Sequence, residues 1–169
     1  MTRTTTGPTC ETRVSPSLCH NGIGLGTGVL TADGELPVEF LEPGDRVVTY
    51  DQGLARLDRV EVRLVPASQA VRVRPSVLDP DGNGRDFILS SRQLLLVRDW
   101  RARFLWHRSI ALVEARQLVD GAHVARLSGD APVRLFQLVF DDPVSYTHLR
   151  AHETRAFIAY AVFCLKTGG

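Results

Sequence analysis

The sequence predicts an all-β domain, and three observations support this prediction. From Gly22 onward, short apolar runs recur at the spacing of roughly eight to twelve residues that is typical of small β domains, and several alternate apolar with polar residues. The sequences TADGE, EPGD, DQG and DPDGNG separate these runs and favour tight turns. The chain has 169 residues, of which 44% are hydrophobic and 23% charged, enough for one domain with one core.

Each expected element follows from a local pattern. Period-two alternation is clearest in VEVRLV at 60–65 and VRVR at 71–74, and it indicates half-buried strands. One short helix is expected at Val113–Leu118, ending at Asp120-Gly121, where glycine can adopt a positive φ. The strands expected from these patterns are Gly28–Leu30, Leu36–Phe40, Arg46–Tyr50, Val60–Val65, Ala70–Arg74, Phe87–Leu89, Leu94–Val97, His123–Leu127 and Val133–Phe140.

Composition excludes several classes of protein. No apolar run reaches the roughly 20 residues of a membrane span, and the first twenty residues lack the apolar core of a secretory signal. Localisation is therefore unknown and cytoplasmic by default. A net charge of +1 argues against nucleic acid or a membrane as partner. The Thr-, Ser- and Pro-rich residues 1–21 are expected to form a flexible arm.

The last part of the chain has a different composition. Nineteen of the 20 basic residues are arginine, and the single lysine is Lys166. VSYTHLRAHET at 144–154 and YAVFCL at 160–165 resemble, in order and in one frame, translated adapters used in preparing sequencing libraries. We therefore expect residues 144–169 to be a non-native tail. The native domain, 22–143, is then expected to be incomplete, leaving the apolar strand 133–140 at an unpaired edge.

Four segments carry a resemblance to a known family. They are GTGVLTADG at 26–34, PVEFL and PGDRVVT between 37 and 49, RDFILSSRQLLL at 85–96 and LVEARQLVDG at 112–121. In this order and at these separations they resemble the hedgehog/intein (Hint) domain, and the similarity is closest to bacterial Hint domains that stand apart from true inteins. The resemblance covers residues 22 to about 140.

The resemblance implies a horseshoe of curved antiparallel strands and an autoprocessing activity. In the family, a cysteine or serine at the first position of the domain attacks the preceding carbonyl, which converts an amide into a thioester or ester. The threonine and histidine of a TxxH motif polarise that amide and supply the proton for the leaving nitrogen. No cofactor is implied.

This chain departs from the family pattern at both functional positions. The family pattern C-F-x-P-G-T aligns with GIGLGT at 22–27, so the position of the nucleophile holds Gly22. TxxH aligns with Ser90-Ser91-Arg92-Gln93, so Gln93 takes the place of the histidine and cannot titrate near neutral pH. Ser90 can still replace the threonine hydroxyl. The sequence therefore predicts a domain inactive in autoprocessing, which acts as a structural or interaction module for an unknown partner or flanking domain.

Two alternatives stay open. Cys19 or Ser17 could act as the nucleophile of an active N-S or N-O acyl shift, although three residues of extended chain displace Cys19 by about 10 Å from Gly22. Alternatively, the stretch Arg98–Arg108, RDWRARFLWHR, could be a loop that binds a partner. In that case Arg101, Arg103 and Trp106 are the expected binding residues.

A metal site is not expected. Cys10, Cys19 and His20 do not have the close pairing of structural zinc ligands, and His107 or His123 would have to complete the set. Neither His107 nor His123 has a sequence partner that would make it a base.

Overall fold

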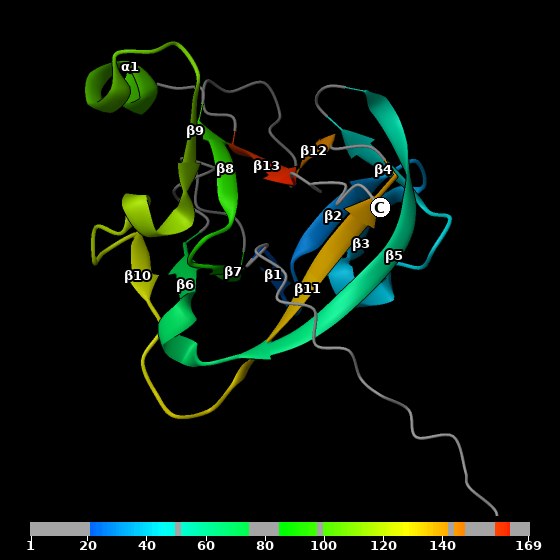
Figure 1. Ribbon diagram of the computed structural model, residues 1–169, viewed down its shortest axis with the longest axis horizontal. Coiled ribbons are helices and arrows are strands. Elements are labelled where there is room, and N and C mark those ends of the chain that lie inside the picture. The colour runs from blue at the N-terminus through cyan, green and yellow to red at the C-terminus, as the bar shows by residue number, and fades with distance from the viewer. Residues whose placement is uncertain are drawn as a thin grey trace, which may run out of the picture.

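The computed structural model describes residues 21–49, 52–74, 85–97, 100–141, 144–147 and 158–162. Within these ranges the chain forms thirteen strands, all of which belong to a single strongly bent sheet (Figure 1). The strands are β1 (Ile23–Gly24), β2 (Gly28–Thr31), β3 (Gly34–Pro37), β4 (Arg46–Thr49), β5 (Gly53–Val65), β6 (Ala70–Val73), β7 (Phe87–Ser90), β8 (Leu94–Val97), β9 (Ala111–Glu114), β10 (Val124–Arg126), β11 (Val133–Phe140), β12 (Val144–Thr147) and β13 (Ile158–Val162).

The sheet has two parts that meet along β5. One part has the strand order β10-β6-β7-β1-β11-β5, and the other continues β5-β4-β12-β13-β8-β9, with the hairpin β2–β3 attached to β4. All of the pairs are antiparallel. Because β7 belongs to the first part and β8 to the second, the short turn between them passes from one part to the other. This turn carries Gln93.

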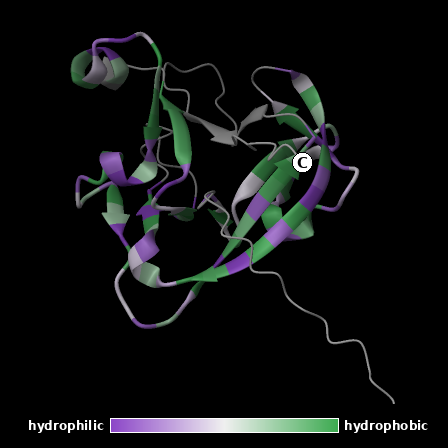
Figure 2. Ribbon diagram, in the orientation of Figure 1, coloured by the Kyte–Doolittle hydropathy of each residue, from purple (hydrophilic) through white to green (hydrophobic). Residues whose placement is uncertain are grey.

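Strand β5 spans both parts because its two halves pair with different neighbours. Residues 53–56 pair with β4, and the remainder pairs with β11 from Leu57 to Val65. A register shift between Val139 and Phe140 of β11 accompanies the bend. Figure 2 shows β5 as a long curved strand on which hydrophilic and hydrophobic residues alternate. Leu57 is buried in the core, whereas Val62 and Leu64 are 54% and 67% exposed.

One apolar core fills the inside of the bent sheet. Strands from both parts contribute fully buried side chains to it, and Ile23, Leu57, Leu89, Leu95 and Leu138 are among the largest. Alternate residues of β11 face this core, because Phe136, Leu138 and Phe140 belong to it while Leu135 and Val139 are buried outside the cluster. The other face of β11 therefore also lies away from solvent.

The predicted all-β class is confirmed, and most of the expected strands are present. Strands β8 and β11 have the predicted bounds, and β5 is longer than the predicted Val60–Val65. The expectation that 133–140 has an unpaired edge is wrong. Strand β11 pairs with β5 along its whole length, and on its other side Leu135 and Phe136 pair with β1.

The helical segments differ from the sequence prediction. Val113 and Glu114 end β9, and only Ala115–Leu118 is helical, as one short 3-10 turn. Gly121, just beyond it, has the expected positive φ of 78°. The predicted loop within Arg98–Arg108 is instead an α-helix, α1 (Trp100–Trp106). Ala102 is fully buried and Trp106 packs against the core, which anchors this helix by one face.

Two observations concern the remaining parts of the chain. Strands β12 and β13 lie within the expected tail, where they pair with each other and with β4 and β8. The expected flexible arm, 1–21, falls outside the described residues except for Asn21. Among the described residues, every helix is too short or too polar to cross a lipid bilayer.

Candidate active site

The structure brings together the two positions at which the sequence departs from the Hint pattern. The backbone N–H of Gly22 donates a hydrogen bond to Oε1 of Gln93 across a distance of 2.9 Å. The two residues are 71 positions apart in the sequence, and both are buried. Gly22 immediately precedes β1, so the nitrogen of the Asn21–Gly22 peptide bond points directly at the Gln93 side chain.

Four hydrogen bonds hold Gln93 in the turn between β7 and β8. Its N–H donates to Ser90 O (3.0 Å), and its carbonyl oxygen accepts from Ala115 N–H (2.8 Å). Its side-chain Nε2 donates to Leu94 O (3.2 Å), while Oε1 accepts from Gly22. Since the Gln93 side chain is fully buried and both of its polar atoms have partners, it has a single well-defined orientation.

Gln93 also completes a strand ladder. The register Ile23↔Leu89 continues to place Gly22 opposite Ser90, and Ser90 N–H donates to Gly22 O at 2.8 Å. Ser90 O accepts the N–H of Gln93, while the N–H of Gly22 donates to the Gln93 side chain. The side chain of Gln93 therefore supplies the acceptor that the ladder lacks at the Asn21–Gly22 bond.

Ser90 contributes through its backbone and its turn. Its Oγ accepts the N–H of Arg92 at 3.3 Å, a local bond that supports the turn leading to Gln93. Its side chain is buried. The structure thus places all three predicted site residues, Gly22, Ser90 and Gln93, in one hydrogen-bonded group.

The space beside Gly22 is narrow. A Cβ built on Gly22 would lie 3.0 Å from Cβ of Leu135 and 3.5 Å from the carbonyl oxygen of Phe136. The φ of Gly22 is not in the left-handed region, so a side chain there meets a steric limit rather than backbone strain. A cysteine at this position requires β11 to move by a few tenths of an ångström.

Gln137 is a further site residue that the sequence analysis did not identify. The β1–β11 register, Ile23↔Phe136 and Gly24↔Leu135, places Gly22 opposite Gln137 when it is continued by one residue. Gln137 is buried, and its Oε1 has no hydrogen-bond partner among the described residues. The available signal was its position as the only uncharged polar residue in the otherwise apolar strand VRLFQLVF.

The next residue in this row across the sheet is charged. Glu61 of β5 lies opposite Gln137, and it accepts hydrogen bonds from Arg63 (2.9 Å) and Arg59 (3.2 Å). The hydrogen bond from Arg63, and then that from Arg59, lowers the pKa of the Glu61 carboxyl, so this group is ionised. Glu61 lies two strands away from Gly22, which corresponds to about 10 Å. This distance is too long for direct proton transfer.

Comparison with known proteins decides the family. The family model described as Hint domain matches residues 23–153, which is more than half of the chain. The chain belongs to the Hint domain family. No curated protein sequence matches it.

Solved structures of the same fold are inteins and an intein-like domain. The bacterial intein-like domain from Clostridium thermocellum has a TM-score of 0.55 and 16% identity, with 83% of this chain and 96% of that chain covered. The AceL NrdHF class 3 split intein, a splice-inactive variant, has a TM-score of 0.52 and 13% identity, with coverages of 84% and 99%. The MchDnaB-1 intein has a TM-score of 0.51 and 14% identity, with 83% of this chain and 99% of that chain covered. At these identities the similarity shows the fold alone.

The chemistry available to this Hint domain follows from its site. Acyl transfer to a side chain requires a sulfur or oxygen nucleophile next to the bond that breaks. Gly22 offers none. Loss of the amide nitrogen requires a proton donor, whereas the atom of Gln93 that faces this nitrogen is an acceptor.

The residues of the alternative predictions are placed only in part. Cys19 and Ser17 lie outside the described residues, as do Cys10 and His20. Arg101, Arg103 and Trp106 all belong to α1; Arg103 is exposed and Trp106 is half-buried against the core. The predicted site residues and the predicted binding residues are therefore on separate elements of the Hint domain.

The two described histidines, His107 and His123, do not belong to a metal-binding group. Among the described residues, no three His, Cys, Asp or Glu side chains lie close enough to hold a metal ion. The expectation that His123 has no partner is wrong, because its Nδ1 lies 3.2 Å from Oδ2 of Asp120. This carboxylate also accepts the N–H groups of residues 122–124, and the bond from Val124 contributes most to a lowered pKa of Asp120.

Proposed function

We propose that this Hint domain is inactive in autoprocessing and acts as a structural or interaction module. The observation that carries the proposal is the hydrogen bond from Gly22 N–H to Oε1 of Gln93, at the position where the family resemblance implies a nucleophile and a proton donor. The two side chains that would perform the chemistry are replaced by a hydrogen atom and a neutral amide.

The magnitudes support inactivity rather than reduced activity. In enzymes that use a nucleophile and a base as a unit, loss of either one removes nearly the whole effect, about 10⁶-fold. Here both are replaced. The amide of Gln93 also stabilises the reactant, because it accepts a hydrogen bond that the intact peptide N–H donates and that a protonated leaving amine would have to rearrange.

Intact-mass spectrometry of the purified chain tests the proposal. The chain is incubated with dithiothreitol, which cleaves a thioester, or with hydroxylamine, which also cleaves an ester. Hydroxylamine additionally cleaves Asn-Gly bonds, of which the chain has two, Asn21-Gly22 and Asn83-Gly84. We expect one unchanged mass in dithiothreitol, and a product that begins at Gly22 in this reagent would contradict the proposal. Products that begin at Cys19 or Ser17 would instead support the active alternative, and Cys19→Ser and Ser17→Ala would assign the nucleophile.

We also propose that residues 144–166 are not part of the natural protein, as their resemblance to translated adapter sequences suggests. The family match continues to residue 153 and thus enters this segment. Amplification of the genomic locus with primers outside it, followed by sequencing across codon 143, is the direct test. We expect the genomic DNA after codon 143 to encode different residues from those of this chain. The same codons in genomic DNA would overturn this proposal.

A further inference from the structure

We propose that α1 and strand β9 form a docking surface for an extended segment of another protein, with acidic and apolar residues in alternation. This inference deepens the proposed interaction role and rests on it. Three features support the inference: the hydrogen-bonding edge of β9, exposed apolar side chains, and positive charges without partners. Figure 1 shows α1 at one extremity of the molecule, beyond the end of β9.

The first feature is a free strand edge. Strand β9 is last in the strand order and, among the described residues, pairs only with β8. Ala115 N–H donates to Gln93 O, so the pair 115–93 is hydrogen-bonded and, by alternation, so are 113–95 and 111–97. The N–H and C=O of Leu112 therefore point away from β8. Consistently, Glu114 N–H donates to the Gln117 side chain rather than to β8.

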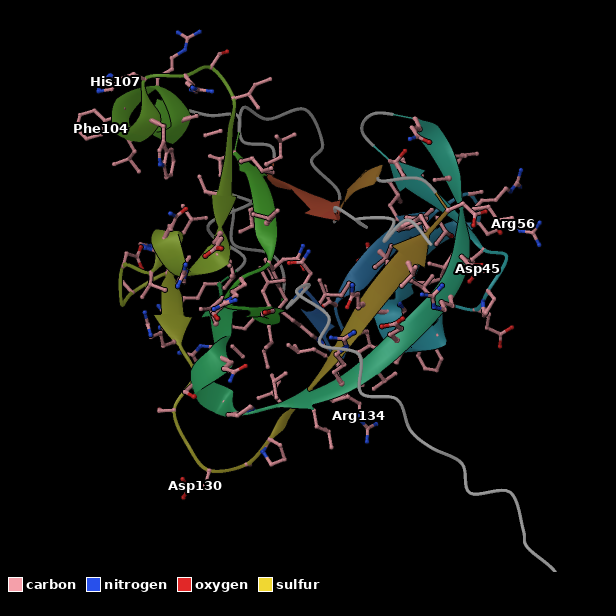
Figure 3. All side chains as sticks on the ribbon, viewed as in Figure 1. Asp45, Arg56, Phe104, His107, Asp130 and Arg134 are labelled. Carbon is pink, nitrogen blue, oxygen red and sulfur yellow. The ribbon has the colours of Figure 1, made fainter. Side chains whose placement is uncertain are left out.

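The second feature is apolar exposure on consecutive segments. Phe104 and Leu105 of α1 are 74% and 53% exposed, because the helix is anchored through Ala102 and Trp106. Ile110, which precedes β9, is 40% exposed, and Leu112, which belongs to β9, is 42% exposed. Exposed apolar groups that gather into a patch rimmed by polar groups mark interaction sites, and these four residues all lie within positions 104–112. Figure 3 shows Phe104 and His107 on the outer side of α1.

The third feature is charge. Arg103 and Arg108 are exposed, and no ion pair holds either of them within the described part of the chain. Residues 100–113 contain no aspartate or glutamate. His107 lies between these arginines and has a positive φ of 54°, which turns the chain back toward β9.

These features select one class of occupant. A free edge accepts an extended strand, which adds to the sheet through backbone hydrogen bonds. The exposed apolar side chains would contact alternate apolar residues of that strand, and the arginines would form ion pairs with the acidic residues between them. A second copy of this chain fits poorly, because it would bring the same uncompensated arginines together.

Fluorescence anisotropy with defined peptides tests the proposal on the full chain. The probe is a fluorescein-labelled peptide of Val-Glu repeats. The comparison peptides are Val-Lys repeats and Val-Glu repeats with N-methylated backbone. The variant Arg103→Glu with Arg108→Glu is compared with Arg56→Glu with Arg134→Glu, a matched charge change at exposed positions on other strands (Figure 3).

We expect saturable binding of the Val-Glu peptide alone, weakened about tenfold or more by the α1-side variant and unchanged by the matched control. Equal weakening by both variants would show non-specific attraction and overturn the proposal. So would binding of the N-methylated peptide, or binding only to phosphatidylglycerol vesicles. Concentration-dependent dimerisation lost in the α1-side variant would also overturn it, in favour of self-association. Cleavage at the Asn21–Gly22 bond is measured separately by mass, so failure of either proposal is distinguishable.

Discussion

Oε1 of Gln93 accepts the backbone N–H of Gly22 at 2.9 Å, and this bond joins a turn between β7 and β8 to the residue that precedes β1. It is buried and lies at the turn that passes from one part of the sheet to the other. A neutral amide in this position holds the Asn21–Gly22 bond without being able to protonate its nitrogen. We therefore propose that position 93 has a structural role in this chain in place of a catalytic one.

Truncation of Gln93 is expected to destabilise the domain. Gln93→Ala leaves the buried Gly22 N–H without an acceptor and opens a cavity, and together these effects cost about 2–4 kcal/mol. Urea denaturation followed by circular dichroism measures the loss. Gln69→Ala, at an exposed glutamine in the segment before β6, is the matched control and should change stability by less than about 0.5 kcal/mol. Equal stabilities of the two variants would show that the Gly22–Gln93 bond contributes nothing.

Thr27 offers a stabilising substitution. Its side chain is buried, and its Oγ1 has no hydrogen-bond partner among the described residues. Thr27→Val removes an unsatisfied hydroxyl at nearly constant volume and should raise the free energy of unfolding by about 1 kcal/mol.

Thr31 is the control for this substitution, because its Oγ1 donates to Gly34 O at 2.7 Å. Thr31→Val should therefore lower the free energy of unfolding by about 1 kcal/mol. Thermal denaturation of both variants compares the signs directly. A loss of stability in Thr27→Val as large as that in Thr31→Val would mean that the Thr27 hydroxyl is satisfied in solution.

Gly24 is required for close packing of β1 on β7. A Cβ at this position would lie 2.7 Å from Cβ of Ile88 and 3.1 Å from its carbonyl oxygen. Gly24→Ala should therefore cost about 2–3 kcal/mol through overpacking. Gly22→Ala, whose Cβ would lie 3.0 Å from Leu135, should cost less. Denaturation midpoints rank the two variants, and a smaller loss for Gly24→Ala would be inconsistent with this packing.

Asp120 should make stability depend on pH on the acidic side. Its pKa is lowered in the folded state, chiefly by the hydrogen bond from Val124 N–H, relative to about 3.9 in the unfolded chain. The stabilisation is therefore complete above the unfolded pKa and is lost as the pH falls through the folded pKa. The difference in stability between the unmodified chain and Asp120→Asn should narrow as the pH falls from 5 to 2.5.

The matched control for this pH dependence is Asp130→Asn, at an exposed carboxylate in the loop before β11 (Figure 3). It should give the same stability as the unmodified chain at every pH. Urea midpoints at several pH values provide the comparison. A gap between Asp120→Asn and the unmodified chain that stays constant with pH would show that the charge of Asp120 is not involved.

Local patterns predicted both a strand in which burial alternates, β8, and a strand that is buried on both faces, β11. Strand β8 and strand β11 begin and end at the expected residues, whereas the first half of β5 was missed. In GLARLDR at 53–59, Leu54 is exposed and Leu57 buried, and the bend at the β11 register shift breaks the period-two pattern. Likewise, among the described side chains of α1, only Ala102 and Trp106 are buried or half-buried, which is too short an apolar face to show periodicity.

Positions in the sheet could not be predicted from local patterns. The sequence suggested an open edge at 133–140, but β11 is interior, because the two residues of β1 pair beside it. So short a strand carries almost no sequence signal. The proximity of Gly22, Ser90 and Gln93 followed only from the family resemblance. Gln137 joins them through the cross-strand register, which only the three-dimensional structure provides.

The most direct test of the central claim compares the unmodified chain with the variant Gly22→Cys, Gln93→His in dithiothreitol, which cleaves a thioester, by intact-mass spectrometry. If the site has kept its geometry and lost only its reactive groups, the unmodified chain stays whole. The double variant then yields a product that begins at position 22, and the single variant Gln93→His yields none. Cleavage of the unmodified chain between Asn21 and Gly22, or a double variant that stays whole although folded, would contradict the account.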